Sequence, residues 1–327
     1  MKQIIWLIFG WISNEAEVSI ESAKNIIKNF DYNKYNLIQI FRSKDNNFYV
    51  VEDIFNINNK TKIELKDFKT KFDIAFLITH WKYWEDWVLQ SLLELEKMPY
   101  TWCRVVSSSV CMNKAVFKNI LKWKGINQVN YEILNFTANT KEEINDIKLN
   151  LKTKFKLPVY IKPANSGSSI GITKLTDRSK LDNAVSEAKK HDDIVLIEEW
   201  LENFRELEVW VIWNSDLKIS NPWELVKDYD FYSFDEKYVV NNMHIETPAK
   251  ITDDQLLEIK TIAKQAYKLY DCKWFARIDF FLHKDKIYLN EINTIPGFTE
   301  ISAFPVLMKS TGMSYTDIIN EIIDLAY

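Results

Sequence analysis

The sequence predicts an α/β protein, and three patterns in it support this prediction. Short apolar runs typical of strands alternate with amphipathic helical segments over the first 105 residues, as in a parallel-sheet domain. A loop of small polar residues follows a predicted strand near residue 163, and a β-hairpin with a polar face is predicted near the C-terminus. The predicted division is an N-terminal α/β domain (1–105), a central domain (106–193) and a C-terminal domain (194–327).

The individual elements follow from the spacing of apolar residues. In the first domain, strands are predicted at 4–9, 36–41 and 72–78, and helices at 18–30 and 87–95. Further along the chain, helices are predicted at 112–122, 251–269 and 315–326, and strands at 157–162, 170–175, 194–199 and 208–212.

Composition narrows the classes of partner. The net charge of −4, with both signs mixed along the chain, argues against a nucleic-acid-binding protein and favours small-molecule partners. Cys103, Cys111 and Cys272 are scattered without metal-ligand spacing, which is typical of reduced thiols in a cytoplasmic protein. The apolar start resembles a signal peptide, but no small-residue cleavage site follows, so a buried strand is favoured. No run of about 20 apolar residues predicts a membrane span.

The hairpin near the C-terminus is the most informative segment. Arg277 and Asp279 are two residues apart and share one strand face, and so do Glu291 and Asn293 on the second strand. Carboxylate and amide oxygens beside an arginine suit Mg²⁺ and phosphate. The alternative is a solvated face with an ion pair. It is less favoured because the neighbouring positions are so apolar that this polar face would be buried without purpose.

A second candidate site is the loop 163–171, which joins two predicted strands and is preceded by Lys162. Its backbone N–H groups and hydroxyls suit phosphate binding, with the lysine supplying positive charge. It is not a P-loop, because no G-K-S/T follows and no helix begins there. A serine-rich hairpin turn would look similar, but Lys114 and the hairpin together strengthen the nucleotide interpretation.

With these motifs in place, the chain resembles the D-alanine–D-alanine ligases of the ATP-grasp superfamily over essentially its whole length. The matching blocks are Phe9–Ser19, His80–Trp87, Pro99–Trp102, Lys162–Gly171, Asn221–Glu224, Phe231–Tyr238 and Arg277–Gly297. The resemblance implies an N-terminal parallel-sheet domain followed by a two-part ATP-grasp fold, with the nucleotide between the central and C-terminal domains.

The resemblance also implies an activity. Members of this family are cytoplasmic ligases of peptidoglycan synthesis, and thus of cell wall biogenesis and cell shape. ATP phosphorylates one D-alanine, and the amine of a second then attacks the D-alanyl phosphate. The expected cofactors are two Mg²⁺ ions, with Mn²⁺ as a substitute. The family commonly forms homodimers, although no self-complementary patch is recognisable in the sequence.

By resemblance, ATP and metal contacts fall on matched positions. Lys114, Lys162 and Lys237 are expected at the phosphates, Glu198 at the adenine hinge and Glu206 at the ribose. Two magnesium ions are expected to bind Asp279, Glu291 and Asn293, with Glu291 bridging them.

Substrate contacts are assigned in the same way. Glu17, in a network with Ser168 and Tyr238, is expected at the amine of the first D-alanine, and His80 near its carboxylate. Ser302 is expected at the carboxylate of the second D-alanine, and Arg277 and the Gly297 N–H at the developing oxyanion. Without the matched blocks, Glu17 would be read as a helix first-turn acid and His80 as a structural histidine. The Lys237-Tyr238 pair favours D-alanine over D-lactate as the second substrate.

The glycine and tryptophan content is abnormal. The chain has 6 glycines and 12 tryptophans, whereas glycine alone usually makes up about 7% of residues. At about ten positions tryptophan stands where the family has glycine or a small residue; we call these the substituting tryptophans: Trp6, Trp11, Trp81, Trp84, Trp87, Trp102, Trp210, Trp213, Trp223 and Trp274. Our hypothesis is that the source organism reads the codon UGA as glycine, whereas the printed sequence translates UGA as tryptophan. The alternative is a divergent ligase that truly uses tryptophan, in which case the first D-alanine pocket is filled.

Two other functions stay open. An ATP-grasp ligase for another carboxylate–amine pair would keep Lys162, Asp279, Glu291 and Asn293, but it has no reason to keep the Glu17 network. An inactive nucleotide-binding protein would bind ATP without D-alanine-dependent turnover. A nicotinamide dehydrogenase is remote, because no G-x-G-x-x-G follows the first strand.

Overall fold

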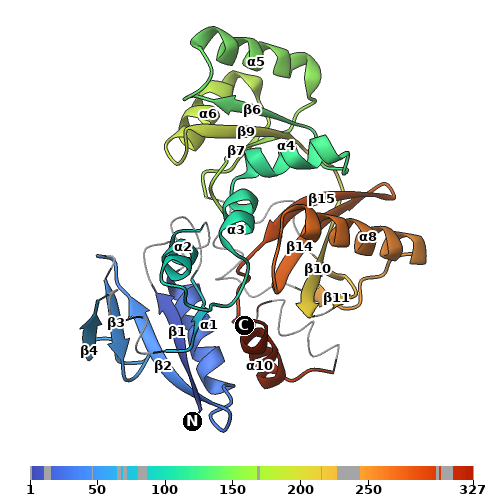
Figure 1. The fold of residues 1–327 in the computed structure, drawn as a ribbon. Helices are drawn as coiled ribbons and strands as arrows, with labels where there is room; N and C mark the ends of the chain where they lie inside the picture. Colours follow the sequence, from blue (N-terminus) through green and yellow to red (C-terminus); the bar gives the residue numbers. More distant parts are fainter. Residues whose placement is uncertain are drawn as a thin grey trace.

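The computed structural model organises the chain around three β-sheets (Figure 1). It describes residues 2–10, 16–45, 47–64, 68, 72–79, 87–167, 170–214, 216–226, 244–299, 302 and 312–326. Figure 1 shows the N-terminal sheet at one end of the molecule, the middle sheet at the other, and the third sheet between them.

The N-terminal sheet has the strand order β4-β3-β2-β1-β5. Its strands and helices are β1 (Gln3–Gly10), α1 (Ala16–Lys28), β2 (Tyr35–Arg42), β3 (Phe48–Val51), β4 (Lys60–Ile63), β5 (Ile74–Leu77) and α2 (Val88–Leu95). β1 pairs in parallel with β2 and β5, which confirms the predicted parallel core. β3 and β4 extend it antiparallel and were not predicted, because they are short and β4 is largely polar and exposed.

The middle sheet has the strand order β6-β9-β7-β8. Its strands and the helices of this region are α3 (Val105–Met112), α4 (Lys114–Lys124), β6 (Tyr131–Asn135), α5 (Lys141–Lys154), β7 (Val159–Pro163), β8 (Thr173–Leu175), the 3₁₀ turn η2 (Arg178–Lys180), α6 (Leu181–Lys189) and β9 (Ile194–Glu199). β9, which the predicted boundary at 194 assigns to the last domain, pairs with β6 and β7. The three-domain division itself stays a prediction.

The predicted helix at 112–122 is wrong at its start. Asn113 has an extended backbone (φ −82°, ψ 95°) and separates α3 from α4. Its side chain accepts hydrogen bonds from the N–H groups of Ala115 and Val116, so it is the N-cap of α4. The cap gives α4 a new start, and Lys114 becomes its first residue.

The third sheet has the strand order β13-β12-β10-β14-β15, with β11 paired to β10. Its elements are β10 (Arg205–Asn214), β11 (Asp216–Ile219), β12 (Trp223–Val226), β13 (His244–Glu246), α8 (Asp253–Leu269), β14 (Phe275–His283) and β15 (Lys286–Asn293). The predicted hairpin is confirmed. Lys284 and Asp285 connect its strands with positive φ at both residues (48° and 62°), as in a type I′ turn.

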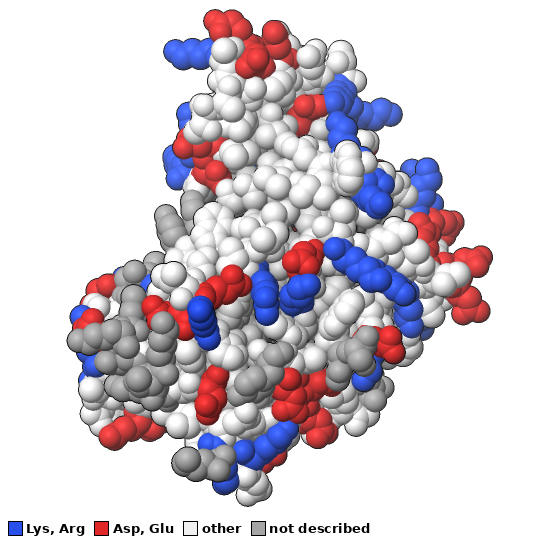
Figure 2. Space-filling view, in the orientation of Figure 1, with Lys and Arg blue, Asp and Glu red and all other residues white. Residues whose placement is uncertain are grey.

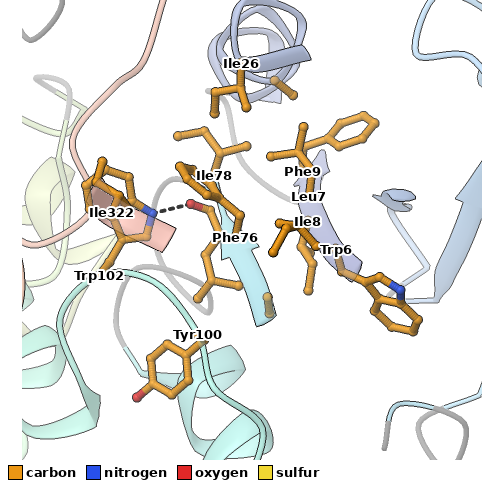
Figure 3. Packing of buried hydrophobic residues seen from close by; sticks show 14 of the residues in the cluster. Trp6, Leu7, Ile8, Phe9, Ile26, Phe76, Ile78, Tyr100, Trp102 and Ile322 are labelled. Carbon is orange, nitrogen blue, oxygen red and sulfur yellow. Dashed lines mark hydrogen bonds between the residues drawn. The ribbon is translucent and has the colours of Figure 1, made fainter. Parts of the chain in front are cut away.

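The last helix, α10 (Tyr315–Leu325), packs against the N-terminal sheet although it ends the chain (Figure 1). Its apolar face, including Ile322, belongs to the same core cluster as Leu7, Ile8 and Phe76 (Figure 3). Residues of the third sheet, among them Phe275, join this cluster as well. The two ends of the chain therefore share one core.

The surface carries charges of both signs. Figure 2 shows lysine and arginine interspersed with aspartate and glutamate on the face in view, in keeping with the small net charge of −4. No helix among the described residues combines the length and apolar character needed to cross a membrane.

The three cysteines are unpaired and buried, as predicted for reduced thiols. They are scattered in the sequence, but the thiol of Cys272 contacts those of both Cys103 and Cys111. Burial raises the pKa of Cys103, so this thiol stays protonated and unreactive.

The substituting tryptophans fall into two groups. Trp87, Trp102 and Trp274 have φ of 121°, 76° and 53°, a region that favours glycine. The others that the structure describes lie on strands: Trp6 on β1, Trp210 and Trp213 on β10, and Trp223 on β12. Trp11, Trp81 and Trp84 lie outside the described residues.

Burial differs between these tryptophans. Trp102 is fully buried, and its indole N–H donates to the carbonyl of Leu77 (Figure 3). Trp6 is also buried and stacks on Phe72. Trp87, by contrast, is 44% exposed, so its unusual backbone is offset by little packing.

Candidate active site

The polar face of the hairpin gathers the residues predicted from its sequence. The guanidinium of Arg277 donates two hydrogen bonds to the carboxylate of Asp279, both at 2.7 Å. In the antiparallel register Arg277 lies opposite Asn293, and Asp279 lies opposite Glu291. The four residues therefore share one face of the sheet. The alternate positions Ile278 and Phe280 belong to the apolar cluster that contains α8, which is why the polar set takes the other face.

β10 adds two acidic residues to this face. Glu208 lies opposite Asp279, and its carboxylate is 3.2 Å from Nε of Arg277. Glu206, the predicted ribose ligand, lies two residues earlier and shares this face. Glu208 was missed by the sequence analysis. Two acids at alternate positions of an otherwise apolar strand were the signal for it.

The arginine is held as a cation by its neighbours. Burial works against its charge, but the carboxylates of Asp279, Glu208 and Glu291 outweigh this effect and raise the pKa of Arg277 above its ordinary value. The site therefore places a permanent positive charge beside oxygen ligands, as transfer of a phosphoryl group requires.

A second polar group is buried between α4 and the middle sheet. The carboxylate of Glu198 is 2.5 Å from Nζ of Lys162 and 3.2 Å from Nζ of Lys118. Lys162 on β7 and Glu198 on β9 share one sheet face, whereas Val159 and Ile161 face the apolar core with α5 and α6. Lys118 was missed by the sequence analysis. Its position one helical turn after Lys114 was the available signal.

This group is an ion-paired triad in a dry environment. Burial opposes the charge on Glu198, but Lys118 and Lys162 outweigh it and lower the pKa of Glu198 to about 2. Burial also lowers the pKa of Lys118, and the charges of Glu198 and Glu291 offset only part of that effect. One carboxylate between two lysines leaves excess positive charge, which suits an anionic ligand.

The pH dependence of stability tests this triad. Because the pKa of Glu198 falls from 4.5 to about 2 on folding, its stabilisation is complete above pH 4.5 and is lost as the pH falls towards 2. We expect Glu198→Gln to lower the free energy of unfolding at pH 7 by on the order of 3 kcal/mol, and at pH 3 by about half as much, because part of the stabilisation is already lost there. Urea unfolding at the two pH values measures this.

Glu199→Gln is the matched control, since Glu199 is the next residue of β9 and bonds instead to Asn130. Its effect is expected to be small at both pH values. A loss of stability in Glu198→Gln that does not change with pH would contradict the ion-paired state.

The predicted phosphate loop is tied to α4. Nζ of Lys114 donates to the carbonyl of Ser166 at 2.5 Å, and its backbone N–H donates to the carbonyl of Ala164 at 3.1 Å. Gly171 has φ +70°, and a Cβ there would lie 2.7 Å from the His191 ring, so only glycine fits. Lys114 and the loop therefore form one unit next to Lys162.

The two polar groups lie within electrostatic range of each other. The charge of Glu291 on β15 contributes to the pKa of Lys118 on α4, so the two lie within electrostatic range. The backbone N–H of Leu289 donates to the carbonyl of Asn127 at 2.9 Å and fixes β15 to the segment after α4. A nucleotide between these groups would have lysines on one side and the arginine–carboxylate cluster on the other.

A third group lies where α1 meets the segment after β15. A Cβ on Gly297 would be 3.1 Å from Oγ of Ser302, so these two predicted residues lie together. Oγ of Ser302 also accepts from the N–H of Thr299 at 3.0 Å. Glu17 is exposed in the first turn of α1. His80, Ser168 and Tyr238, which were predicted for the same site, lie outside the described residues, and so does Lys237, which was predicted at the phosphates.

The donor set of the hairpin fits a hard divalent cation. Asp279 and Glu291 supply carboxylates from opposite positions of two strands, and Asn293 supplies an amide oxygen. Over the part of the chain that the structure describes, no group of three or more His, Cys, Asp or Glu side chains is arranged to hold a metal. The predicted set has only two such side chains, so the amide or a ligand must supply the rest.

Two family models match the chain. The model described as D-ala D-ala ligase N-terminus matches residues 4–103, and the model described as D-ala D-ala ligase C-terminus matches residues 120–324. A D-alanine–D-alanine ligase of Caldicellulosiruptor bescii is 37% identical, over 99% of this chain and 95% of that protein. D-alanine–D-alanine ligase B of Clostridium tetani is 38% identical, over 100% of this chain and 94% of that protein.

Solved structures are similar over the same length. The VanG D-Ala:D-Ser ligase from Enterococcus faecalis has a TM-score of 0.88 and 29% identity and covers 100% of both chains. The D-alanine–D-alanine ligase from Coxiella burnetii has a TM-score of 0.85 and 28% identity, over 99% of this chain and 94% of that chain.

Proposed function

Because the chain belongs to the D-alanine–D-alanine ligase family, we propose that it joins two D-alanines with ATP as phosphoryl donor, for peptidoglycan precursor synthesis. The observation that carries this proposal is the convergence of Arg277, Asp279, Glu291 and Asn293 on one face of the hairpin. That face combines a fixed cation with hard oxygen ligands, which suits phosphoryl transfer to a carboxylate.

The proposed reaction has two steps. The γ-phosphoryl group of ATP passes to a carboxylate oxygen of the first D-alanine, and ADP leaves. The amine of the second D-alanine then attacks the carbonyl carbon, and phosphate leaves as the peptide bond forms. Negative charge develops on the carbonyl oxygen during the attack, and the guanidinium of Arg277 with the N–H of Gly297 is proposed to stabilise it.

Nucleotide binding is assigned to the lysines and the acids around them. Lys114, Lys162 and Lys237 are proposed to contact the phosphates, Glu198 the adenine and Glu206 the ribose. The ion pair between Lys162 and Glu198 supports this assignment. Lys162 would then contact both the phosphates and the residue proposed to bind the adenine. Lys118 keeps the carboxylate of Glu198 ionised and able to accept a hydrogen bond.

Magnesium is the proposed cofactor, with Asp279, Glu291 and Asn293 as its protein ligands. When bound, it would neutralise charge on the transferring phosphoryl group. Arg277 already donates two hydrogen bonds to Asp279, so the arginine also orients this carboxylate.

Metal dependence gives a direct prediction. It is measured, like every activity below unless stated otherwise, on the form with glycine at the substituting tryptophans, which we call the glycine form. Removing divalent cations with EDTA is expected to abolish ADP release, and excess Mg²⁺ or Mn²⁺ is expected to restore it. Asn293→Leu is expected to raise the Mg²⁺ concentration for half-maximal rate by about tenfold or more, because one oxygen ligand is lost. A rate that does not change in EDTA, or an unshifted Mg²⁺ dependence in the variant, would contradict the assignment.

The two D-alanines are assigned to the region where α1 meets the 297–302 segment. Glu17, Ser168 and Tyr238 are proposed to bind the amine of the first D-alanine, His80 its carboxylate, and Ser302 the carboxylate of the second. A cytoplasmic location and a homodimer, both common in the family, complete the proposal.

The proposal is tested by ADP release with one substrate omitted at a time. Release that requires D-alanine, with D-alanyl-D-alanine as product, is expected. D-serine and D-lactate, each added in place of the second D-alanine, test the specificity of the second site, since one similar structure is a D-Ala:D-Ser ligase. ATP binding without release under any of these conditions would identify an inactive nucleotide-binding protein. Release with other amino acids only would identify a ligase of another pair.

A further inference from the structure

Phe298 lies after the hairpin. Side chains of two helices that are far apart in the sequence bind the N–H and the carbonyl group of its backbone. The N–H of Phe298 donates to Oγ of Ser22 at 3.1 Å. Its carbonyl oxygen accepts from Nδ2 of Asn25 at 3.0 Å and from the hydroxyl of Tyr315 at 2.6 Å. Ser22 and Asn25 belong to α1, and Tyr315 is the first residue of α10. The donor and both acceptor positions of this residue are therefore filled.

These contacts lie in a dry environment. Ser22 and Phe298 are fully buried, and Asn25 is 6% exposed. Buried polar groups are costly unless they are matched, so this arrangement strongly favours one position of the segment. The ring of Phe298 adds edge contacts with Trp102 and Tyr315, at centroid distances of 5.6 and 5.3 Å.

The held residue lies between Gly297, which is assigned to the oxyanion, and Ser302, which is assigned to the carboxylate of the second D-alanine. Gly297 precedes it, and Ser302 lies 3.1 Å from where a Cβ on Gly297 would be. Thr299 follows it and donates its N–H to Oγ of Ser302. A shift of Phe298 would therefore move the oxyanion N–H and the carboxylate-binding hydroxyl together.

The same helix carries a residue assigned to the first D-alanine. Glu17 is five residues before Ser22 on α1, a rise of about 7.5 Å. Oγ of Ser19 accepts from the N–H of Gly10 at 3.0 Å and donates to the carbonyl of Ile78 at 2.5 Å. α1 is thus fixed near the ends of β1 and β5 while it holds Phe298.

We propose that Ser22, Asn25 and Tyr315 are positioning residues that set the distance between the two D-alanine sites. They act through the backbone of Phe298 and touch neither substrate. The inference rests on the proposed function, because it concerns the amine of the second D-alanine as it approaches the acyl phosphate of the first. A displacement of about 1 Å at that step costs on the order of 100-fold in rate.

A competing nucleophile isolates this step. Hydroxylamine attacks the carbonyl carbon of D-alanyl phosphate through its nitrogen. The carbon–oxygen bond to phosphate then breaks, giving D-alanine hydroxamate and inorganic phosphate. The ratio of hydroxamate to dipeptide reports how well the second D-alanine is positioned. Defects in ATP binding or in the first step lower both products and leave the ratio unchanged.

Single substitutions are designed to remove one contact each. Ser22→Ala and Tyr315→Phe each lose one hydrogen bond to Phe298, and the ratio is expected to rise about tenfold in each. Ser22→Thr keeps the hydroxyl and is expected to return the ratio towards that of the glycine form without substitutions at these contacts. The matched control is Thr316→Val, since Thr316 on α10 bonds to the carbonyl of Asn29, the residue directly after α1, instead of to Phe298. Its ratio is expected to stay the same.

The outcomes separate the inference from the proposed function. If the glycine form without these substitutions makes neither product, the proposed function fails and the inference fails with it. If it forms both products but the ratio is the same in Ser22→Ala, Tyr315→Phe and Thr316→Val, only the inference is overturned. An equal rise in Thr316→Val would also overturn it, because general docking of α10 would then explain the effect.

Discussion

Replacing Arg277 by methionine is expected to lower kcat for dipeptide formation by about 100- to 1,000-fold. In the proposed reaction its guanidinium stabilises the oxyanion and orients Asp279 through two hydrogen bonds of 2.7 Å. Arg277→Lys keeps the charge but loses the two-pronged contact, so an intermediate loss is expected. ADP release at saturating substrate concentrations measures both variants. A methionine variant with nearly full kcat would exclude Arg277 from the reaction.

The same substitution is expected to lower the free energy of unfolding by about 3 to 5 kcal/mol at pH 7. It leaves the carboxylates of Asp279 and Glu208, with Glu291 nearby, without the cation that lies among them. Arg205→Met is the matched control, because it breaks a more exposed arginine–glutamate pair, with Glu224, on the same sheet. Its loss is expected to be smaller. Equal losses at the two sites would contradict the electrostatic account of the cluster.

Replacing all the substituting tryptophans by glycine is expected to have the second large effect. Only this glycine form is expected to be active. The left-handed backbone of Trp87, Trp102 and Trp274 costs about 1–2 kcal/mol per residue for any side chain larger than hydrogen. Trp6 and Trp223 add buried indole N–H groups that have no hydrogen-bond partner among the described residues. Each such group costs about 1–3 kcal/mol. The sum of these costs is a large part of the free energy of unfolding of a typical domain.

Single glycine substitutions in the tryptophan chain are expected to have opposite signs. Trp87→Gly should raise the free energy of unfolding by about 1–2 kcal/mol, because it relieves strain at a half-exposed site. Trp102→Gly should lower it, because the lost packing of a buried indole, about 3–5 kcal/mol, exceeds the strain relieved. Trp123→Ala, at an 80% exposed position on α4, is the control and should change little. Urea unfolding measures all three variants. A loss of stability in Trp87→Gly would contradict the strain argument.

These opposite signs bear on the UGA hypothesis. Positive φ supports glycine at Trp87, Trp102 and Trp274, whereas Trp6, Trp210, Trp213 and Trp223 lie on strands where backbone strain does not argue for it. Only the replacement of all the substituting tryptophans by glycine tests the hypothesis. A single replacement is measured in a protein whose packing still contains the other indole rings.

The hairpin was predictable from sequence because apolar and polar residues alternate along both of its strands. Apolar residues at alternate positions pack towards α8, so the polar residues between them must share the other face. The short turn at Lys284 and Asp285 then sets the register that brings Asp279 opposite Glu291.

The contacts between separate elements were not predictable from periodicity. Lys118 and Glu208 join the site through packing between a helix and a sheet or between two strands, and alternation alone does not reveal such neighbours. Phe298 is held by α1 and α10, whose residues are as many as 276 positions away in the sequence. The break at Asn113 was readable as an N-cap, but the apolar spacing on both sides masked it.

The most direct test of the ligase assignment is detection of D-alanyl-D-alanine by mass spectrometry, with ADP in equal amount. It uses two purified proteins, the chain as printed and its form with glycine at the substituting tryptophans. We expect dipeptide from the glycine form and none from the printed chain. A folded glycine form that makes no dipeptide from D-alanine and ATP would contradict the ligase assignment. Dipeptide from the printed chain would instead contradict the UGA hypothesis.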